Sequence, residues 1–207
     1  DDQMKLKESF IKILLPSVFI TAVLIFGIIS LSKPIIIVLL GERWLPAAEI
    51  LQLLAFSALL YPASLFNITI MKIKHHSDLV LKIEIIKKIL AVPTILASIF
   101  FGMKAMIIFI VFNSFIDWGL NSFFAGRMIK YPIKEQVKDI IPALFVSAFM
   151  GFIVFVSTLF LSSMNPVFLV LQVILGFFVI IIFGETIQLT PYIIIKEIVI
   201  KLLKSRE

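Results

Sequence analysis

The sequence predicts an all-α integral membrane protein with six transmembrane helices and a C-terminal amphipathic helix at the membrane interface. Of its 207 residues, 61% are hydrophobic and 15% are charged, which is too little charge to cover a soluble domain of this length. Apolar segments of about 20 residues, enough to cross a bilayer, recur along the chain. Backbone groups in lipid must pair within each segment, and the residue alternation that a membrane β-barrel needs is absent, so the segments are expected to be helices.

The spans are expected in the following order. The first covers about 11–31, where Lys33 and Pro34 end it before a short apolar turn to Leu40. The second covers about 46–73 and contains Pro62, which should kink it. The others are expected at about 79–101, 104–129, 140–161 and 166–183. Residues 1–189 then form one six-span unit, and 190–207 form a separate tail.

The tail is expected to be a helix that lies along the cytoplasmic face of the membrane. Thr190 is a suitable N-cap, and Pro191 suits the first helical position. Its apolar residues are interspersed with Lys196, Lys201 and Lys204, a composition typical of interfacial rather than spanning helices.

Basic residues predict the orientation of the chain. Most lie before span one, between spans two and three, between spans four and five, or after span six: Lys5, Lys7, Lys12, Lys72, Lys74, Lys82, Arg127, Lys130, Lys134, Lys138, Lys196, Lys201, Lys204 and Arg206. The opposite side carries Lys33, Arg43 and Lys104. Because cytoplasmic loops are rich in lysine and arginine, both ends are expected in the cytoplasm. The net charge of +6 then follows from orientation, and no nucleic-acid partner is expected.

Residue types suited to covalent chemistry are scarce. The sequence has no cysteine, which excludes disulfides and thiolate metal sites. The two histidines, His75 and His76, are adjacent and have no spaced partners, so neither a metal centre nor a cofactor is expected. Catalytic arrangements such as Ser-His-Asp, paired carboxylates or a glycine-rich phosphate loop are not visible. We therefore expect the protein not to be an enzyme.

The fourth expected span contains a polar cluster, NSFIDWGLNS at 113–122. Asn113, Asp117 and Asn121 recur every four residues and therefore share one helix face. Inserting a charged side chain at the centre of a membrane helix costs about 2.5–3.5 kcal/mol, so we expect the cluster to have a functional or structural role. One interpretation is a cation or proton site, with charge from Asp117 and neutral oxygens from the asparagines. The other is an interhelical hydrogen-bond cluster in which Asp117 carries a proton.

The third expected span carries Glu84, Lys87 and Lys88 on one face. Glu84 precedes Lys88 by four residues, the favourable order for a helical ion pair, which leaves Lys87 without a partner in its own helix. With Gln52 and Asn67 of the second span, these residues are candidates for contacts to an anionic head group such as a pyrophosphate. The alternative for the lysines is snorkelling, because Lys88 is only about 14 Å from the cytoplasmic helix end.

One stretch resembles a known family. Residues 39–88 read LLGERWLPAAEILQLLAFSALLYPASLFNITIMKIKHHSDLVLKIEIIKK. They combine LLGE-x-W, an A-x-x-x-L-Q sequence, a Tyr-Pro near mid-span and SDL-x-LK-x-E-x-x-KK. In this order and spacing the stretch resembles the second half of bacterial polysaccharide flippases of the multidrug/oligosaccharidyl-lipid/polysaccharide superfamily. The chain departs from these relatives at His75-His76, where they often have a glycine before Ser77.

The resemblance implies one lobe of a transporter built from two six-helix lobes around a cleft. The chain lacks an initiator methionine, so we expect the C-terminal lobe, with the N-terminal lobe outside this sequence. The implied activity is flipping of undecaprenyl-pyrophosphate-linked oligosaccharide across the bacterial inner membrane, for surface polysaccharides such as O-antigen. The alternatives are a drug/cation antiporter of the same superfamily and, further away, a membrane polysaccharide polymerase or ligase.

The resemblance also bears on the candidate residues. It implies that the first two spans line the cleft and that the third lies further out. Drug-exporting relatives tend to have a cation-binding carboxylate in this same lobe, which favours a coupling role for Asp117.

Overall fold

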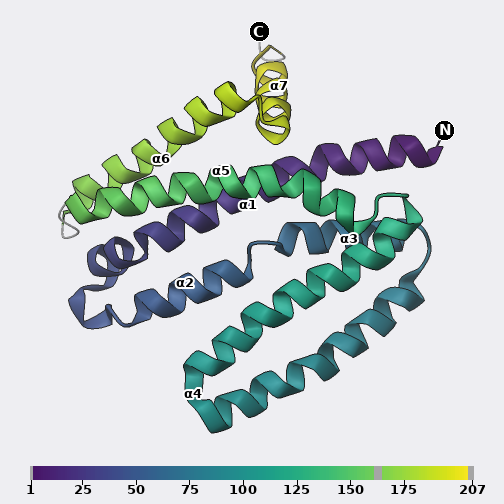
Figure 1. The fold of residues 1–207 in the computed structure, drawn as a ribbon, viewed down its shortest axis with the longest axis horizontal. Coiled ribbons are helices and arrows are strands. Elements are labelled where there is room, and N and C mark those ends of the chain that lie inside the picture. The colour runs from purple at the N-terminus through teal and green to yellow at the C-terminus, as the bar shows by residue number, and fades with distance from the viewer. Residues whose placement is uncertain (1, 161–164, 205–207) are drawn as a thin grey trace.

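The structure is a computed structural model that describes residues 2–160 and 165–204, and all regular elements of these residues are helices (Figure 1). In chain order they are α1 (Asp2–Leu40), the short 3-10 helix η1 (Glu42–Trp44), α2 (Ala47–Ser57), α3 (Tyr61–Ile73), α4 (Ser77–Met128), α5 (Ile133–Phe160), α6 (Pro166–Ile187) and α7 (Thr190–Lys204).

The first helix is longer than the sequence predicts. α1 continues through Pro16 and Pro34 to Leu40, so the expected end of the first span near Pro34 is wrong. The apolar residues on either side of Pro34 are buried, which holds the helix together by packing. The Gln52 side chain also donates a hydrogen bond to the Ile29 carbonyl, 3.1 Å away, one turn before the proline.

The second expected span is broken in its middle. α2 ends at Ser57, Ala58–Leu60 form a turn, and α3 begins at Tyr61. Pro62 is therefore in the first turn of α3, where its missing N–H removes no helical hydrogen bond. The sequence-based prediction of a disturbance at Pro62 is confirmed, and the structure makes it a complete break just upstream.

α4 is a helical hairpin. Its two arms meet at Gly102, whose φ of 78° and ψ of −175° are not helical, and the arms run back along each other (Figure 1). This backbone conformation is open almost exclusively to glycine. The arms correspond to the spans expected at 79–101 and 104–129.

Five helical stretches are long and apolar enough to cross a membrane: Met4–Leu40, Ala47–Ile73, Ser98–Met128, Ile133–Phe160 and Pro166–Ile187. The first arm of α4, which carries Lys82, Glu84, Lys87 and Lys88, is not among them. A membrane protein is thus supported, with five of the six expected spans. The expected end of span five at Leu161 and the end of the tail at 205–207 lie outside the described residues.

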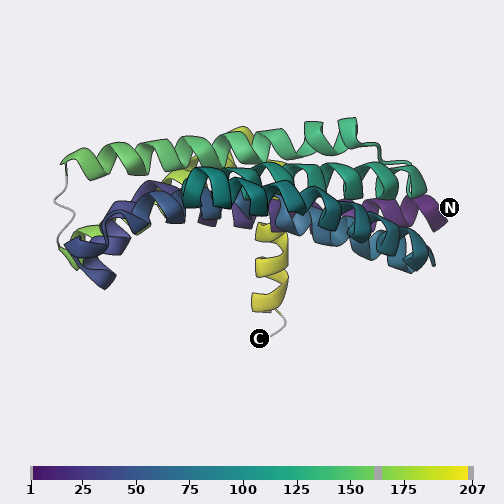
Figure 2. The ribbon, with the colours of Figure 1, turned by 90° about the horizontal axis from the view of Figure 1, so that it is seen from below.

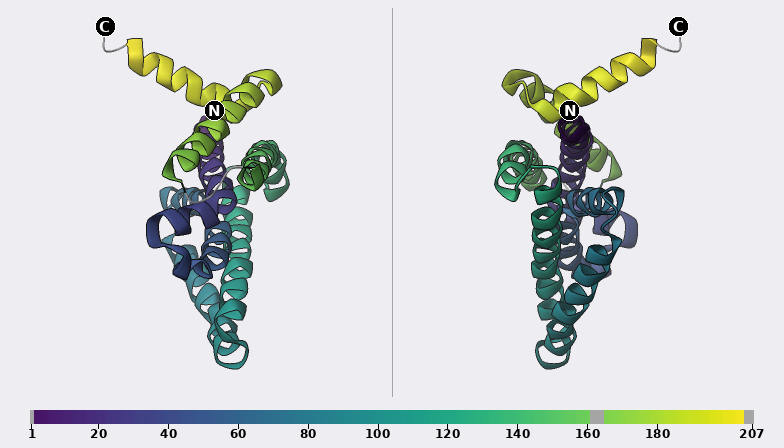
Figure 3. Two further views of the ribbon diagram at one scale, coloured as in Figure 1. Left: turned by 90° about the vertical axis from the view of Figure 1, so that its left-hand side faces the viewer. Right: turned by 90° about the vertical axis from the view of Figure 1, so that its right-hand side faces the viewer.

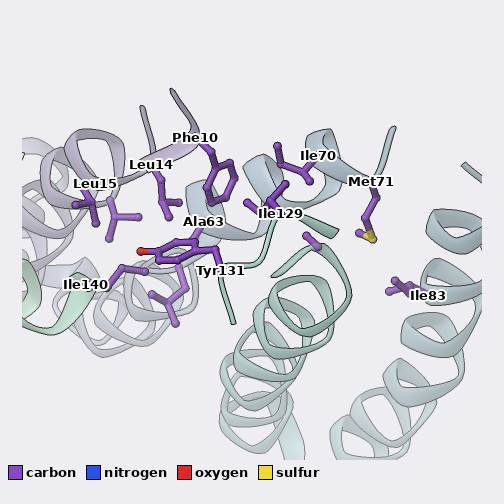
Figure 4. Close-up of a cluster of buried hydrophobic side chains, with 13 residues drawn as sticks. Phe10, Leu14, Leu15, Ala63, Ile70, Met71, Ile83, Ile129, Tyr131 and Ile140 are labelled. Carbon is purple, nitrogen blue, oxygen red and sulfur yellow. The ribbon is translucent and has the colours of Figure 1, made fainter. Parts of the chain in front are cut away.

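The helices pack around two main apolar clusters. The larger one joins α1, α3, α4 and α5 around the fully buried Leu14, Met71 and Tyr131 (Figure 4). The other joins α1, α5 and α6 and includes Phe19, Met150 and Val179, with side chains of α7 packed against it.

The outer surface of the bundle is also apolar. Phe100, Phe101 and Phe112 on the α4 hairpin are 73%, 78% and 64% exposed, which a water-facing surface rarely tolerates in such numbers. The amphipathic α7 projects away from the bundle, across the direction of the long helices (Figures 2 and 3). The arrangement is that of a multi-pass membrane protein, and the helix expected in the tail is present.

Candidate functional site

Several of the polar side chains predicted as site residues meet between α3 and the two arms of α4. Ser64 and Asn67 lie one turn apart on the same side of α3. Asp117 and Asn121 lie one turn apart on the second arm of α4 and face them, and Lys87 reaches in from the first arm. The hairpin at Gly102 makes this possible, because it brings together charges that are 30 positions apart in the chain.

Asp117 is held by three side chains. One carboxylate oxygen pairs with the Lys87 ammonium, and the other accepts hydrogen bonds from the Ser64 hydroxyl and, at 3.3 Å, from the Asn121 amide nitrogen. Asn121 also donates to the Ser64 hydroxyl at 2.6 Å. Both carboxylate oxygens are therefore satisfied, and Lys87 occupies the place beside Asp117 that a bound cation would take.

Lys87 joins two carboxylates. Besides Asp117 it contacts Glu84 at 2.7 Å, one turn earlier on its own arm, and its side chain is 14% exposed. The expected pairing of Glu84 with Lys88 is thus wrong, as is the expectation that Lys87 lacks a partner in its helix. An i,i+3 contact replaced the i,i+4 one because Lys87 lies between the arms, where Asp117 adds a second attraction, whereas Lys88 is exposed on the outer side.

A second polar layer lies next to the first. Asn67, which is fully buried, donates to the Ser122 hydroxyl at 3.0 Å and to the Gln136 side-chain oxygen at 3.2 Å. Gln136 donates in turn to the Tyr131 carbonyl at 3.0 Å. This layer ties α3 to the corner between α4 and α5 through neutral hydrogen bonds.

Two buried carbonyl oxygens of these layers have no hydrogen-bond partner within the described residues, Asn67 Oδ1 and Asn121 Oδ1. Their amide orientations are fixed, because the nitrogen of Asn67 faces the Ala63 carbonyl and that of Asn121 faces the Asp117 carboxylate. Each oxygen is therefore free to accept a hydrogen bond from a water molecule or a proton carrier.

The remaining sequence candidates lie elsewhere. Asn113 donates to Thr94 at 2.7 Å across the hairpin, so the structure does not bring it to Asp117. Asn121 presents its nitrogen, not its oxygen, to Asp117, which is the reverse of the cation-ligand role that the sequence suggested. Gln52 donates to Ser32 at 2.8 Å, between α1 and α2.

Ser64, Ser122 and Gln136 take part in these layers but were not among the site residues predicted from the sequence. Serines are common on membrane helices, and only the α3–α4 contact makes Ser64 a partner of Asp117. Gln136 is fully buried although it precedes the expected start of its span. In the sequence, the only indication of its role was that a polar residue stands at the edge of an apolar run.

The site offers no cluster of metal ligands: within 2–160 and 165–204, no three His, Cys, Asp or Glu side chains gather closely enough to hold a metal ion. Comparisons of this chain with protein-family models, with curated proteins and with solved structures found no match.

Proposed function

We propose that this chain is the C-terminal lobe of a bacterial flippase that carries undecaprenyl-pyrophosphate-linked oligosaccharide across the inner membrane by alternating access. The resemblance of residues 39–88 to polysaccharide flippases supports this cargo. The observation that carries the mechanism is the Lys87–Asp117 ion pair, which links the two arms of the α4 hairpin. In this proposal both arms of α4 cross the membrane, giving six spans, and both ends of the chain are cytoplasmic.

The ion pair is proposed to couple transport to protons. A proton on Asp117 would remove the attraction that holds Lys87 against the second arm of α4, and would weaken the hydrogen bonds from Ser64 and Asn121. Lys87 would then remain with Glu84 on its own arm. The break between α2 and α3 immediately precedes this part of α3, so release of Ser64 would let α3 turn about the break.

The cleft wall is proposed to carry a polar contact for the cargo on α1 and α2. A pocket of about 180 Å³ there is lined by Ser30, Ser32, Lys33 and Gln52, together with residues of α5. Lys33 supplies a positive charge suited to a phosphate and Gln52 a neutral amide suited to a sugar hydroxyl. Gln52 is thereby retained as a head-group candidate.

The other head-group candidates change role in this proposal. Lys87 and Glu84 are engaged with each other, and Asn67 is buried. Lys88 faces outward on the first arm of α4, where snorkelling toward the phospholipid head groups suits it.

A drug/cation antiporter is the competing assignment. Cationic cargo needs carboxylates that are open to it, and both carboxylates beside Lys87 are in contact with its ammonium, which leaves one net negative charge among the three groups. Because both carboxylates are engaged, cationic drugs are the less favoured cargo. A polymerase or ligase is less well supported. The segment between α1 and α2 is short and includes η1, so it leaves little room for a catalytic loop.

The test is complementation of a bacterial strain that lacks its own flippase, using the whole transporter that carries this chain. We expect the wild type to restore surface polysaccharide and Asp117→Asn to fail at equal membrane levels. The matched control is Glu49→Gln, which breaks an exposed ion pair with Lys104, 2.7 Å long, by the same chemical change. It should restore polysaccharide as the wild type does.

Two results would count against this proposal in different ways. Full complementation by Asp117→Asn would remove the coupling role and leave the polar cluster as a structural contact. Failure of the wild type with a panel of lipid-linked sugars, together with export of cationic drugs, would replace the flippase by the antiporter.

A further inference from the structure

A pocket of about 180 Å³ lies between α1, α5 and α6, away from the polar cluster, and its lining is almost wholly apolar. The α1 residues that line it run from Val23 to Ile35, about 18 Å of helix at 1.5 Å per residue. Its lining residues Leu24, Val173 and Phe177 are exposed, so the pocket is continuous with the outer apolar surface. All three helices are candidate spans, and the pocket therefore opens within the hydrocarbon region.

One buried amide lines this pocket. Gln172 is 1% exposed, and its side-chain nitrogen finds no acceptor in the part of the chain that the structure describes. An unpaired buried donor is unfavourable, and more so where no water is available. Methylene groups can fill the pocket but cannot accept this hydrogen bond. The best occupant is therefore a hydrocarbon chain that carries an acceptor oxygen.

The depth of Gln172 matches such an occupant. It is the seventh residue of the 22-residue α6, about 9 Å from the end of a helix about 33 Å long. It therefore lies in the outer third of the span, toward the level at which phospholipid ester groups begin. The end of α1 and the start of α6 lie at the same end of the bundle (Figure 1), so the pocket runs inward from that level.

We infer that this pocket binds one acyl chain of a membrane phospholipid, with the ester carbonyl oxygen, which an ether-linked chain lacks, accepting a hydrogen bond from the Gln172 nitrogen. The chain fills the volume between α1 and α6, and the amide fixes its depth. Nothing in this assignment depends on the cargo of the transporter.

Two glycines allow a matched test. A Cβ placed on Gly27, which lines the pocket, meets no atom of the described residues within 4 Å, and the same holds for Gly119 on α4. Gly27→Leu therefore adds a leucine side chain to the pocket lining with no clash at its Cβ, and Gly119→Leu adds the same side chain elsewhere, also with no clash at its Cβ. Gln172→Leu removes the donor but keeps an apolar side chain of similar size.

The experiment uses the full chain, reconstituted in phosphatidylethanolamine–phosphatidylglycerol vesicles with a tracer phosphatidylethanolamine that carries a diazirine on one acyl chain. Photolabelling is mapped to peptides, and labelling of α4 serves as the internal reference for folding. We expect labels on α1 and α6, lost in Gly27→Leu and kept in Gly119→Leu. Gln172→Leu should weaken labelling about fivefold with the ester-linked tracer, the effect of one neutral hydrogen bond, and not with an ether-linked one.

Three outcomes would overturn the inference. Undiminished labelling in Gly27→Leu would mean that no chain enters the pocket. Stronger competition by a polyprenyl phosphate than by phosphatidylethanolamine would assign the pocket to an isoprenoid chain instead. Cross-linking between two copies of the protein at these helices would mean that a second copy covers the opening.

Discussion

At the scale of single residues, helix ends in this chain adopt left-handed backbone without glycine. His75, Lys130 and Gln188 have φ of 60°, 52° and 53°, each just after a helix. At the end of α3, the N–H of His76 bonds to the Met71 carbonyl at 2.9 Å and that of His75 to the Lys72 carbonyl at 3.0 Å. This is the Schellman pattern, in which glycine usually occupies the left-handed position.

Replacing His75 by glycine should stabilise the protein. The left-handed conformation carries a steric cost for a residue with a Cβ, so His75→Gly should raise the free energy of unfolding by roughly 0.5–1 kcal/mol. Denaturant unfolding in detergent micelles measures this. His76→Gly is the control, because His76 has a φ of −100°, and should give no gain. Equal effects of both substitutions would show that the left-handed backbone of His75 carries no steric cost that glycine removes.

At the scale of elements, close approach of backbone fixes the corner between α4 and α5. A Cβ on Gly126 would lie 2.4 Å from the Tyr131 carbonyl oxygen, an atom of the backbone. The same corner is held by Tyr131, whose hydroxyl donates to Asp139 at 2.6 Å. Burial and the carboxylate of Asp139 raise the pKa of the Tyr131 hydroxyl, so it remains a donor at every physiological pH.

Gly126→Ala and Gly119→Ala should therefore have opposite effects on stability, although both glycines lie in α4. Gly126→Ala should lower the free energy of unfolding by about 1–3 kcal/mol, because the corner must move. Gly119→Ala, with open space around the new methyl group, should raise it by up to about 1 kcal/mol through helix propensity. Thermal unfolding in micelles compares them, and a loss at Gly119 as large as at Gly126 would contradict the packing described for this corner.

Much of the order of the helices follows from the sequence, and the predictions that were wrong were wrong for physical reasons. Apolar runs predicted the helices of five candidate spans, and Pro62 predicted a kink close to the point where α2 and α3 separate. Pro34 did not end α1, because burial on both sides outweighed the lost hydrogen bond. The site was only half predictable: Asp117 and Asn121 share a helix face by periodicity, but the pairing with Lys87 needs the fold at Gly102, which spacing within one helix cannot reveal.

At the scale of the whole molecule, the loops separate into two ends. The loops at 74–76 and 129–132 lie at the end where α1 starts, and the turn of the α4 hairpin and the segment 41–46 lie toward the opposite end (Figure 1). With basic residues at the first end, that end should be cytoplasmic.

Single cysteines test this orientation cleanly, because the chain has none of its own. Cysteines at Lys74 and Lys130 should be protected from an impermeant thiol reagent in intact cells, and cysteines at Glu42 and Met103 should react. Permeabilised cells provide the control for accessibility. Reaction of the cysteine at Lys74 in intact cells would mean that the orientation is the reverse of the predicted one. Protection of the cysteine at Met103 would mean that the α4 hairpin does not cross the membrane.

We propose above that the Lys87–Asp117 ion pair couples transport to a proton gradient. Its most direct test is the rate at which the whole transporter, reconstituted in vesicles, moves lipid-linked oligosaccharide with and without an imposed pH gradient. We predict that the gradient accelerates the wild type and Glu49→Gln alike, and that Asp117→Asn moves cargo at one rate under both conditions. Equal acceleration of Asp117→Asn and the wild type would mean that this ion pair does not couple transport to protons.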